Sequence, residues 1–226
     1  MDQSVVEWCE AHTDAYTYST NIAELTNTFS NLAFTLVSLL SIYEFNNPLF
    51  RTCNIVLFLV GIGSATFHAT DTYLGQILDE APMSMLMYYY LFIACHIQKW
   101  RFPRVMYIGL ATFGWSLYLT FRIYTIFITM FVVQLVFPIL IVVFYVKKTK
   151  TQKRLLLYSL VMALIAKSCW IYERYLHATF QCPTMFVDPS YYLHSYWHIG
   201  IAIAHYLFMK TLFACSNDKP FYSNQI

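Results

Sequence analysis

Seven predominantly apolar stretches alternate with short polar connections along the chain. They cover approximately residues 29–45, 52–70, 76–97, 104–120, 123–146, 155–171 and 191–214. A helix needs about 20 such residues, within a range of about 17 to 25, to cross the hydrocarbon core of a bilayer. The connections are too short to hold a separate soluble domain. The pattern therefore predicts an all-α membrane protein, with residues 1–226 forming a single seven-transmembrane helix bundle.

The composition supports a membrane protein. Of the 226 residues, 58% are hydrophobic and only 12% are charged, whereas about 25% of the residues in a soluble domain are charged. The net charge of +2 and the lack of a basic patch interleaved with aromatic residues argue against a nucleic-acid partner. We therefore expect the lipid bilayer as the main partner, and we infer no obligatory protein partner.

The positive charges predict the direction of the chain, because lysine and arginine concentrate in cytoplasmic loops. Residues 1–21 contain four acidic residues and neither lysine nor arginine. Positive charges follow the third, fifth and seventh stretches: Lys99, Arg101, Arg104, Lys147, Lys148, Lys150, Lys153, Arg154, Lys210 and Lys219. We expect an outside or lumenal N-terminus, a cytoplasmic C-terminus, and residence in the endoplasmic reticulum or Golgi membrane. Cys9 and Cys182 would then face an oxidising compartment, where a disulfide between them can form.

Polar side chains gather at the outer end of the predicted bundle. Ionisable residues inside membrane spans are costly and tend to serve function. Those at this end are Ser64, His68, Asp79, Glu80, Glu173, His194 and His198, with Glu24 and Asn27 just ahead of the first stretch. Chance placement would scatter such residues over the length of the bundle, so the clustering predicts a functional site at this end.

Two of these residues, His194 and His198, are four apart and share one face of a helix. Such a pair within an aromatic helix is more often structural than metal-binding. His68, at the same depth on another stretch, changes that balance, because three neutral imidazoles with one open position form a catalytic zinc site. The sequence therefore predicts zinc bound by His68, His194 and His198.

The neighbouring polar groups indicate a reaction. Zinc lowers the pKa of a bound water from about 15.7 to about 7, which makes a nucleophile available near neutral pH. Asp79 is placed to act as the general acid and base, and the Ser64 hydroxyl can donate to a developing oxyanion. These parts predict metal-assisted hydrolysis of an amide or ester, and a substrate that reaches such a site from the bilayer should be a lipid.

The chain resembles the alkaline ceramidases, which belong to a wider group of seven-span membrane hydrolases that includes the adiponectin receptors. The matching pieces, in order, are EWCE, IAELTNTFSN, SATFH, LDEAP and HSYWH. The resemblance implies hydrolysis of the ceramide amide bond to a sphingoid base and a free fatty acid. Carried over, it assigns zinc to the three histidines, acid/base work to Asp79 and oxyanion stabilisation to Ser64.

The resemblance also implies a calcium site in an acidic lumenal segment, residues 1–21, that packs at the site end and stimulates activity. Oxygen ligands suit calcium. His12 stands where the family has an asparagine, and Asp14 could replace that lost ligand. The implied ligands are Glu7, the Trp8 carbonyl, Glu10, Asp14 and Glu24. An ordinary solvated acidic tail is the alternative.

Two other functions fit the same pattern of residues. The first is a related hydrolase that acts on another lipid amide or ester. The second is a seven-span receptor or transporter without hydrolase activity, in which the histidines gate the protein or couple it to protons. Only this last reading predicts that the purified protein contains no stoichiometric zinc.

Overall fold

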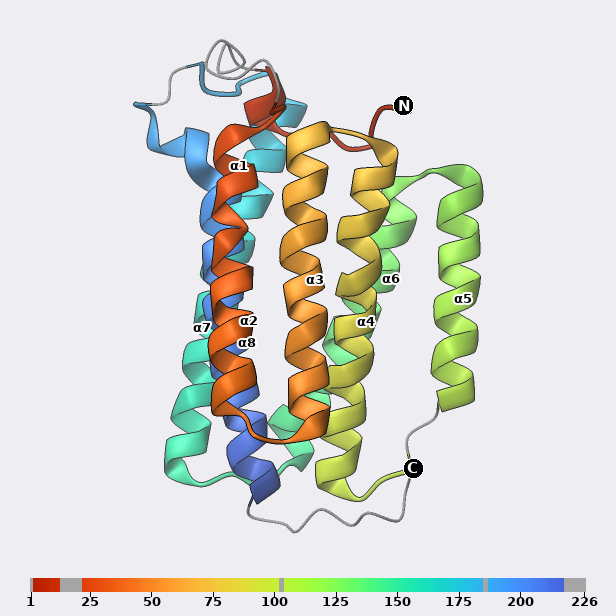
Figure 1. Cartoon of the computed structure of the whole chain (residues 1–226), viewed down its shortest axis with the longest axis vertical. Helices are drawn as coiled ribbons and strands as arrows, with labels where there is room; N and C mark the ends of the chain where they lie inside the picture. The colour runs from red at the N-terminus through yellow and green to blue at the C-terminus, as the bar shows by residue number, and fades with distance from the viewer. Residues whose placement is uncertain (1, 13–21, 102–103, 185–186, 218–226) are drawn as a thin grey trace.

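The computed structural model of the chain describes residues 2–12, 22–101, 104–184 and 187–217. These residues form helices and connecting segments, with one isolated antiparallel bridge between Gln3 and Thr72. The long helices run side by side along the long axis of the molecule (Figure 1). For the described residues, this confirms the predicted all-α class.

The helices follow one another with short connections. In chain order they are η1 (Cys9–His12), α1 (Leu25–Ser30), α2 (Leu32–Glu44), α3 (Pro48–Thr70), α4 (Tyr73–Gln98), α5 (Arg104–Phe121), α6 (Tyr124–Leu140), η3 (Ile141–Tyr145), α7 (Lys150–Ala178), η4 (Pro189–Tyr192) and α8 (Leu193–Asn217). α1 continues into α2 through Asn31, and α6 continues into η3, so each pair forms one long helical segment.

Five segments of the described chain are long and apolar enough to cross a membrane. They are Leu25–Glu44, Pro48–Thr70, Tyr124–Tyr145, Lys150–Ala178 and Pro189–Ser216. The two other long helices, α4 and α5, are not among these five segments. The structure thus supports a membrane protein with several crossings. The count of seven and the direction of the chain stay predictions.

The turn between α3 and α4 is tight, and local sequence explains it. α3 ends at Asp71, whose backbone is left-handed with a φ of 47°. Thr72 then caps α4, because its side chain accepts a hydrogen bond from the Gly75 N–H at 3.1 Å. The short reversal makes the two helices antiparallel neighbours. As a result, the end of α3, with His68, lies beside the start of α4, with Asp79.

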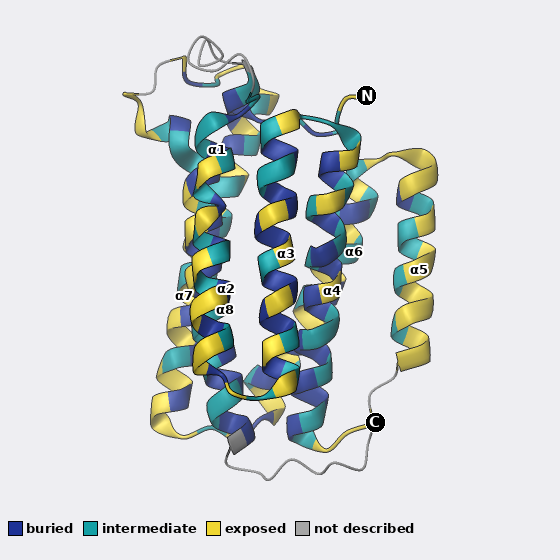
Figure 2. Cartoon of the chain, viewed as in Figure 1, coloured by how far each residue is buried: buried dark blue, intermediate teal, exposed yellow. Residues whose placement is uncertain are grey.

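The interior divides into an apolar region and a polar end. The main apolar cluster includes Phe34, Phe50, Leu57, Tyr90 and Met209, which come from α2, α3, α4 and α8. Figure 2 shows buried positions on the inward faces of these helices and exposed ones on the outward faces. Many outward positions hold leucine, isoleucine, valine or phenylalanine. Exposed apolar surface of this extent is suited to contact with lipid rather than water.

Candidate metal centre

Three histidine side chains converge at the polar end of the bundle. His68 lies near the end of α3, while His194 and His198 lie on the first two turns of α8. One ring nitrogen of each lies within 4.8 Å of those of the other two. All three residues are buried, at most 3% exposed. Within the described residues, no other histidine, cysteine or carboxylate joins this group, so it offers three ligands and an open position.

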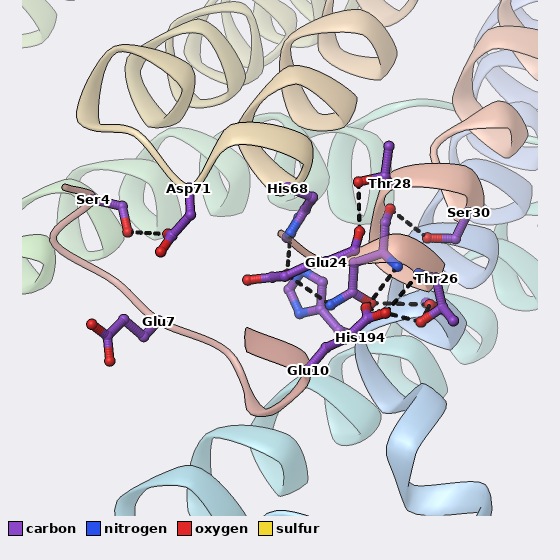
Figure 3. A network of polar contacts seen from close by, with 12 residues as sticks. Ser4, Glu7, Glu10, Glu24, Thr26, Thr28, Ser30, His68, Asp71 and His194 are labelled. Atoms are coloured by element: carbon purple, nitrogen blue, oxygen red, sulfur yellow. Dashed lines mark hydrogen bonds and ion pairs between the residues drawn. The ribbon is translucent and has the colours of Figure 1, made fainter. Parts of the chain in front are cut away.

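Two buried carboxylates hold two of these rings by the nitrogen that faces away from the centre. The Nδ1 of His68 lies 2.6 Å from Glu24 Oε2, an interaction drawn in Figure 3. The Nδ1 of His194 lies 2.8 Å from Glu173 Oε2. A carboxylate can only accept a hydrogen bond, so each Nδ1 carries the proton. Metal-binding histidines are usually oriented and made more basic by such a partner.

The third ring, that of His198, is held by a serine, and the direction of that hydrogen bond can be derived. The Ser30 hydroxyl donates to the carbonyl oxygen of Asn27 at 2.9 Å. Its single proton is therefore used, and the 2.7 Å contact between Ser30 Oγ and His198 Nδ1 must be donated by the imidazole. In its neutral form, each of the three histidines consequently carries its proton on Nδ1 and a lone pair on Nε2. This set of neutral imidazoles fits zinc.

Ser64 and Asp79 face each other across the contact between α3 and α4. The Ser64 hydroxyl donates a hydrogen bond to the Asp79 carboxylate, which also interacts electrostatically with His68. Ser64 is buried. Glu80, the next residue, accepts instead from the Gln76 side chain at 2.8 Å. The structure thus brings Asp79, rather than Glu80, to the serine and the histidines.

Gly63 allows the backbones of α3 and α4 to approach each other closely. A Cβ added to Gly63 would overlap the carbonyl oxygen of Leu78, which belongs to the backbone of α4. Only glycine leaves space for a backbone at that position. Because Gly63 precedes Ser64 and Leu78 precedes Asp79, the close approach brings the Ser64 and Asp79 side chains together.

The N-terminal residues lie over the centre. Cys9 forms the predicted disulfide with Cys182, and its N–H donates to Glu173 Oε1 at 3.4 Å. Arg174 donates to the Glu7 carbonyl oxygen at 2.6 Å. The indole of Trp8 is buried, with its centroid 3.9 Å from that of His194. These contacts close the outer side of the centre within the described residues.

The residues predicted to bind calcium have several different partners. Glu10 Oε1 accepts from the Thr26 N–H at 2.7 Å, and Oε2 accepts from the Asn27 N–H at 2.9 Å (Figure 3). Burial raises the pKa of the Glu10 carboxyl, and these two backbone hydrogen bonds oppose that rise. Glu10 thus occupies the N-terminus of α1, where unpaired N–H groups favour an anion. Calcium at Glu10 would have to replace some of these hydrogen bonds.

The other residues predicted to bind calcium are distributed around that position. The Glu24 carboxylate accepts hydrogen bonds from two side chains, the His68 ring and Asn27, whose Nδ2 donates to it at 2.9 Å. The Glu7 carboxylate accepts from Gln3 at 3.0 Å and lies apart from Glu10 in Figure 3. The Trp8 carbonyl accepts from the Ala11 N–H at 3.2 Å. Asp14 lies outside the described residues.

Sequence reasoning placed Glu24 and Glu173 at the correct end but assigned neither to a histidine, and it did not single out Ser30. The signal for the two glutamates was present, because a buried acid near a metal histidine commonly orients it. Ser30 gave no such signal, since a serine at the end of a polar segment has many uses. Its role becomes visible only when α1 packs beside α8.

Fold and site together define a class: an α-helical membrane protein with a buried centre of three imidazoles, an adjacent acid–hydroxyl pair and an open ligand position. A sequence model of the ceramidase family matches residues 1–222. The chain therefore belongs to the ceramidase family.

Individual relatives agree with this assignment. The alkaline ceramidase of Drosophila melanogaster is 30% identical over an alignment of 238 positions, which covers 96% of this chain and 80% of that protein. Alkaline ceramidase 1 of Mus musculus is 29% identical, over 88% of this chain and 76% of the relative. The alkaline ceramidase of Arabidopsis thaliana is 27% identical, over 94% of this chain and 84% of the relative.

Proposed function

We propose that the protein is a zinc-dependent hydrolase that cleaves the amide bond of ceramide to a sphingoid base and a free fatty acid. The observation that carries the proposal is the converging set of three buried histidines, each with its Nδ1 proton held by Glu24, Glu173 or Ser30. Membership of the ceramidase family and the names of the relatives support ceramide as the substrate.

The Nε2 atoms of His68, His194 and His198 would hold the zinc. When bound, zinc supplies Lewis acidity for the substrate carbonyl and a water of lowered pKa. The hydrogen bonds at Nδ1 orient the three rings and leave each Nε2 available as a ligand atom. Trp8, packed on His194, excludes solvent from one side.

Asp79 would move the proton. Its carboxylate takes a proton from the attacking water as the new C–O bond forms, and then delivers it to the amide nitrogen as the C–N bond breaks. The nitrogen leaves as the amine of the sphingoid base, and the carbonyl carbon leaves as a carboxylic acid. Proton and bond changes therefore balance without another reactant.

Ser64 would stabilise charge on the former carbonyl oxygen. Its hydroxyl donates to the Asp79 carboxylate in this structure. Once Asp79 has accepted a proton, its oxygen becomes a weaker acceptor, and the Ser64 O–H can turn to the oxyanion. The reaction would thus couple proton uptake by Asp79 to oxyanion stabilisation by Ser64.

The proposal includes the membrane setting. Seven spans with a lumenal N-terminus would place the centre near the lumenal surface of the endoplasmic reticulum or Golgi membrane, within reach of a lipid in the bilayer. A calcium ion held by the N-terminal acidic residues would stimulate activity by ordering this segment over the zinc centre. The acidic, lysine-free composition of the segment supports this part, and calcium at Glu10 would take the place of some of its hydrogen bonds to Thr26 and Asn27.

The deciding experiment measures zinc content and ceramide turnover on the same purified protein. We expect one zinc per chain and turnover of ceramide. Asp79→Asn should retain zinc and lose turnover by a factor of roughly 10² to 10⁴, the usual size of general acid–base catalysis. His194→Ala should lose both.

Three outcomes would count against the proposal or part of it. A folded protein with no stoichiometric zinc would favour the receptor or transporter function. A zinc-containing protein that cleaves another lipid amide or ester and leaves ceramide intact would favour the related hydrolase. Loss of zinc in Asp79→Asn would make Asp79 a ligand rather than the acid and base.

A further inference from the structure

The indole of Trp8 carries a buried hydrogen-bond donor beside the metal centre. Trp8 lies in the N-terminal segment just before η1, and only 3% of its surface is exposed. Its Nε1 is buried without a hydrogen-bond partner among the described residues. A buried indole N–H usually finds an acceptor, because leaving the donor unpaired costs free energy. The N–H of Trp8 therefore needs an explanation.

The ring lies against the histidines. Its centroid is 3.9 Å from that of His194 and 6.4 Å from that of His68. The disulfide of the next residue, Cys9, holds the segment on the outer side of the centre. A group that accepts a hydrogen bond from Trp8 would therefore also lie beside the three imidazoles.

The neighbours of the ring cannot accept this hydrogen bond. The Nδ1 of His194 donates to a carboxylate, and its Nε2 is the atom assigned to the metal. The guanidinium of Arg174, with its Cζ 5.1 Å from the ring centroid, has only donors. Val6 and Phe67, which form one cluster with Trp8, have apolar side chains. These neighbours thus supply no acceptor, whereas a bound molecule with an oxygen atom can.

We infer that the indole N–H of Trp8 donates a hydrogen bond to the primary hydroxyl of the sphingoid base in ceramide; this inference rests on the proposed function. In ceramide, the carbon that bears the amide nitrogen is bonded to the carbon that bears this hydroxyl. The hydrocarbon chains favour the apolar interior of the bundle and bilayer, so the hydroxyl end of the lipid faces the outer side, which Trp8 covers. Trp8 is therefore a specificity-determining residue that distinguishes a lipid with this hydroxyl from one without it.

The test uses two substrates that differ by one oxygen atom. Turnover of ceramide and of 1-deoxyceramide, which lacks the primary hydroxyl, is measured as kcat/KM. The wild-type protein should prefer ceramide. Trp8→Phe keeps an aromatic ring against His194 and removes the N–H, so it should reduce the preference roughly tenfold, the effect of one hydrogen bond. The loss should fall on ceramide rather than on 1-deoxyceramide.

Trp170→Phe is the matched control. Trp170 packs on Trp8 with a centroid distance of 6.0 Å, but its indole nitrogen is not among the buried donors that lack a partner in the described part of the chain. This variant should leave the preference for ceramide unchanged. Zinc content and the thermal midpoint establish that each variant is folded. Should Trp8→Phe not fold, benzothienylalanine at position 8 replaces the N–H by sulfur and keeps both rings.

The outcomes separate this inference from the proposed function. Ceramide turnover with the wild-type preference retained in a folded variant that lacks the N–H would reject the hydroxyl contact and leave the hydrolase standing, with a buried water as the partner of Trp8. A wild type that shows no preference would reject the contact as well. If the protein cleaves no ceramide, equilibrium binding of the same two lipids replaces turnover. Tighter binding of ceramide that is lost in Trp8→Phe would then reject the hydrolase and keep the hydroxyl contact.

Discussion

At the scale of single residues, the centre depends on the groups that hold the histidines as much as on the histidines themselves. Glu173 is the clearest case, because it links the His194 ring to the backbone of Cys9 in the N-terminal segment. Its carboxylate fixes the His194 proton on Nδ1 and increases the electron density at Nε2. In the proposed zinc site, Glu173 is therefore a positioning residue.

Replacing Glu173 should weaken zinc binding without removing any ligand. Glu173→Gln keeps the shape and loses the charge, and we expect zinc affinity to fall about 10- to 100-fold, the usual effect of losing such a partner. Competition with a chelator measures the affinity. Glu44→Gln is the control, because Glu44 is an acid of α2 that pairs with Lys210. This variant should bind zinc as the wild type does. Equal affinity in both variants would remove Glu173 from the metal centre.

At the scale of secondary-structure elements, the decisive contact is that of α3 with α4. The tight turn at Asp71 and Thr72 sets the two helices antiparallel, and Gly63 lets their backbones approach. The hydrogen bond between Ser64 and Asp79 exists because of this approach. The geometry of this serine–aspartate pair follows from helix packing and not from loop conformation.

Gly63→Ala tests that contact. The added methyl group would meet a backbone carbonyl that cannot turn aside. We therefore expect the free energy of unfolding to fall by about 1 to 3 kcal/mol, as for other overpacked sites. Turnover should fall further than zinc content, because Asp79 and Ser64 separate while the histidines remain. Thermal unfolding and metal analysis measure the two effects.

Gly109→Ala provides the comparison within the same protein. A Cβ at Gly109 in α5 meets nothing within 4 Å. Alanine is the better helix former by about 1 kcal/mol, so this variant should be as stable as the wild type or slightly more stable. If Gly63→Ala behaved in the same way, the close approach would not be what positions Asp79.

At the scale of the whole molecule, the N-terminal segment joins parts of the chain that lie far apart in sequence. The disulfide ties Cys9 to Cys182, and Glu10 occupies the start of α1. Glu24, the residue before α1, then holds His68 on α3. Any ion bound by this segment would therefore act on the metal centre through Glu24 and α1.

Removing calcium should accordingly lower turnover in the wild-type protein while zinc stays bound. We expect EGTA, used at a concentration that spares the zinc, to reduce activity, and we expect Glu10→Gln to lose this response. Turnover and zinc content are measured before and after calcium is restored. Glu44→Gln at the opposite end of the bundle should respond as the wild type does. A wild-type enzyme indifferent to EGTA would leave residues 1–21 as a structural cover.

Much of the candidate site could be predicted from the sequence, because depth in a helical bundle follows from residue number. Each residue advances a helix by 1.5 Å, so His68, Asp79, His194 and Ser64 could be assigned to one end before any packing was known. The same reasoning put Cys9 and Cys182 in one compartment, and the disulfide is confirmed. The count of seven spans stays a prediction, because five segments of the described chain are long and apolar enough to cross a membrane.

The sequence by itself determined that the chain is helical, rich in apolar surface and equipped with three histidines at one depth. Only the tertiary structure decided which side chains face one another around the bundle. Ser30 meets His198 across 168 residues, and Glu24 meets His68 across 44. Rotation about a helix axis is set by packing against other helices, and no local pattern encodes it. For that reason the tautomers of the histidines, the place of Glu10 and the surroundings of Trp8 came from the fold.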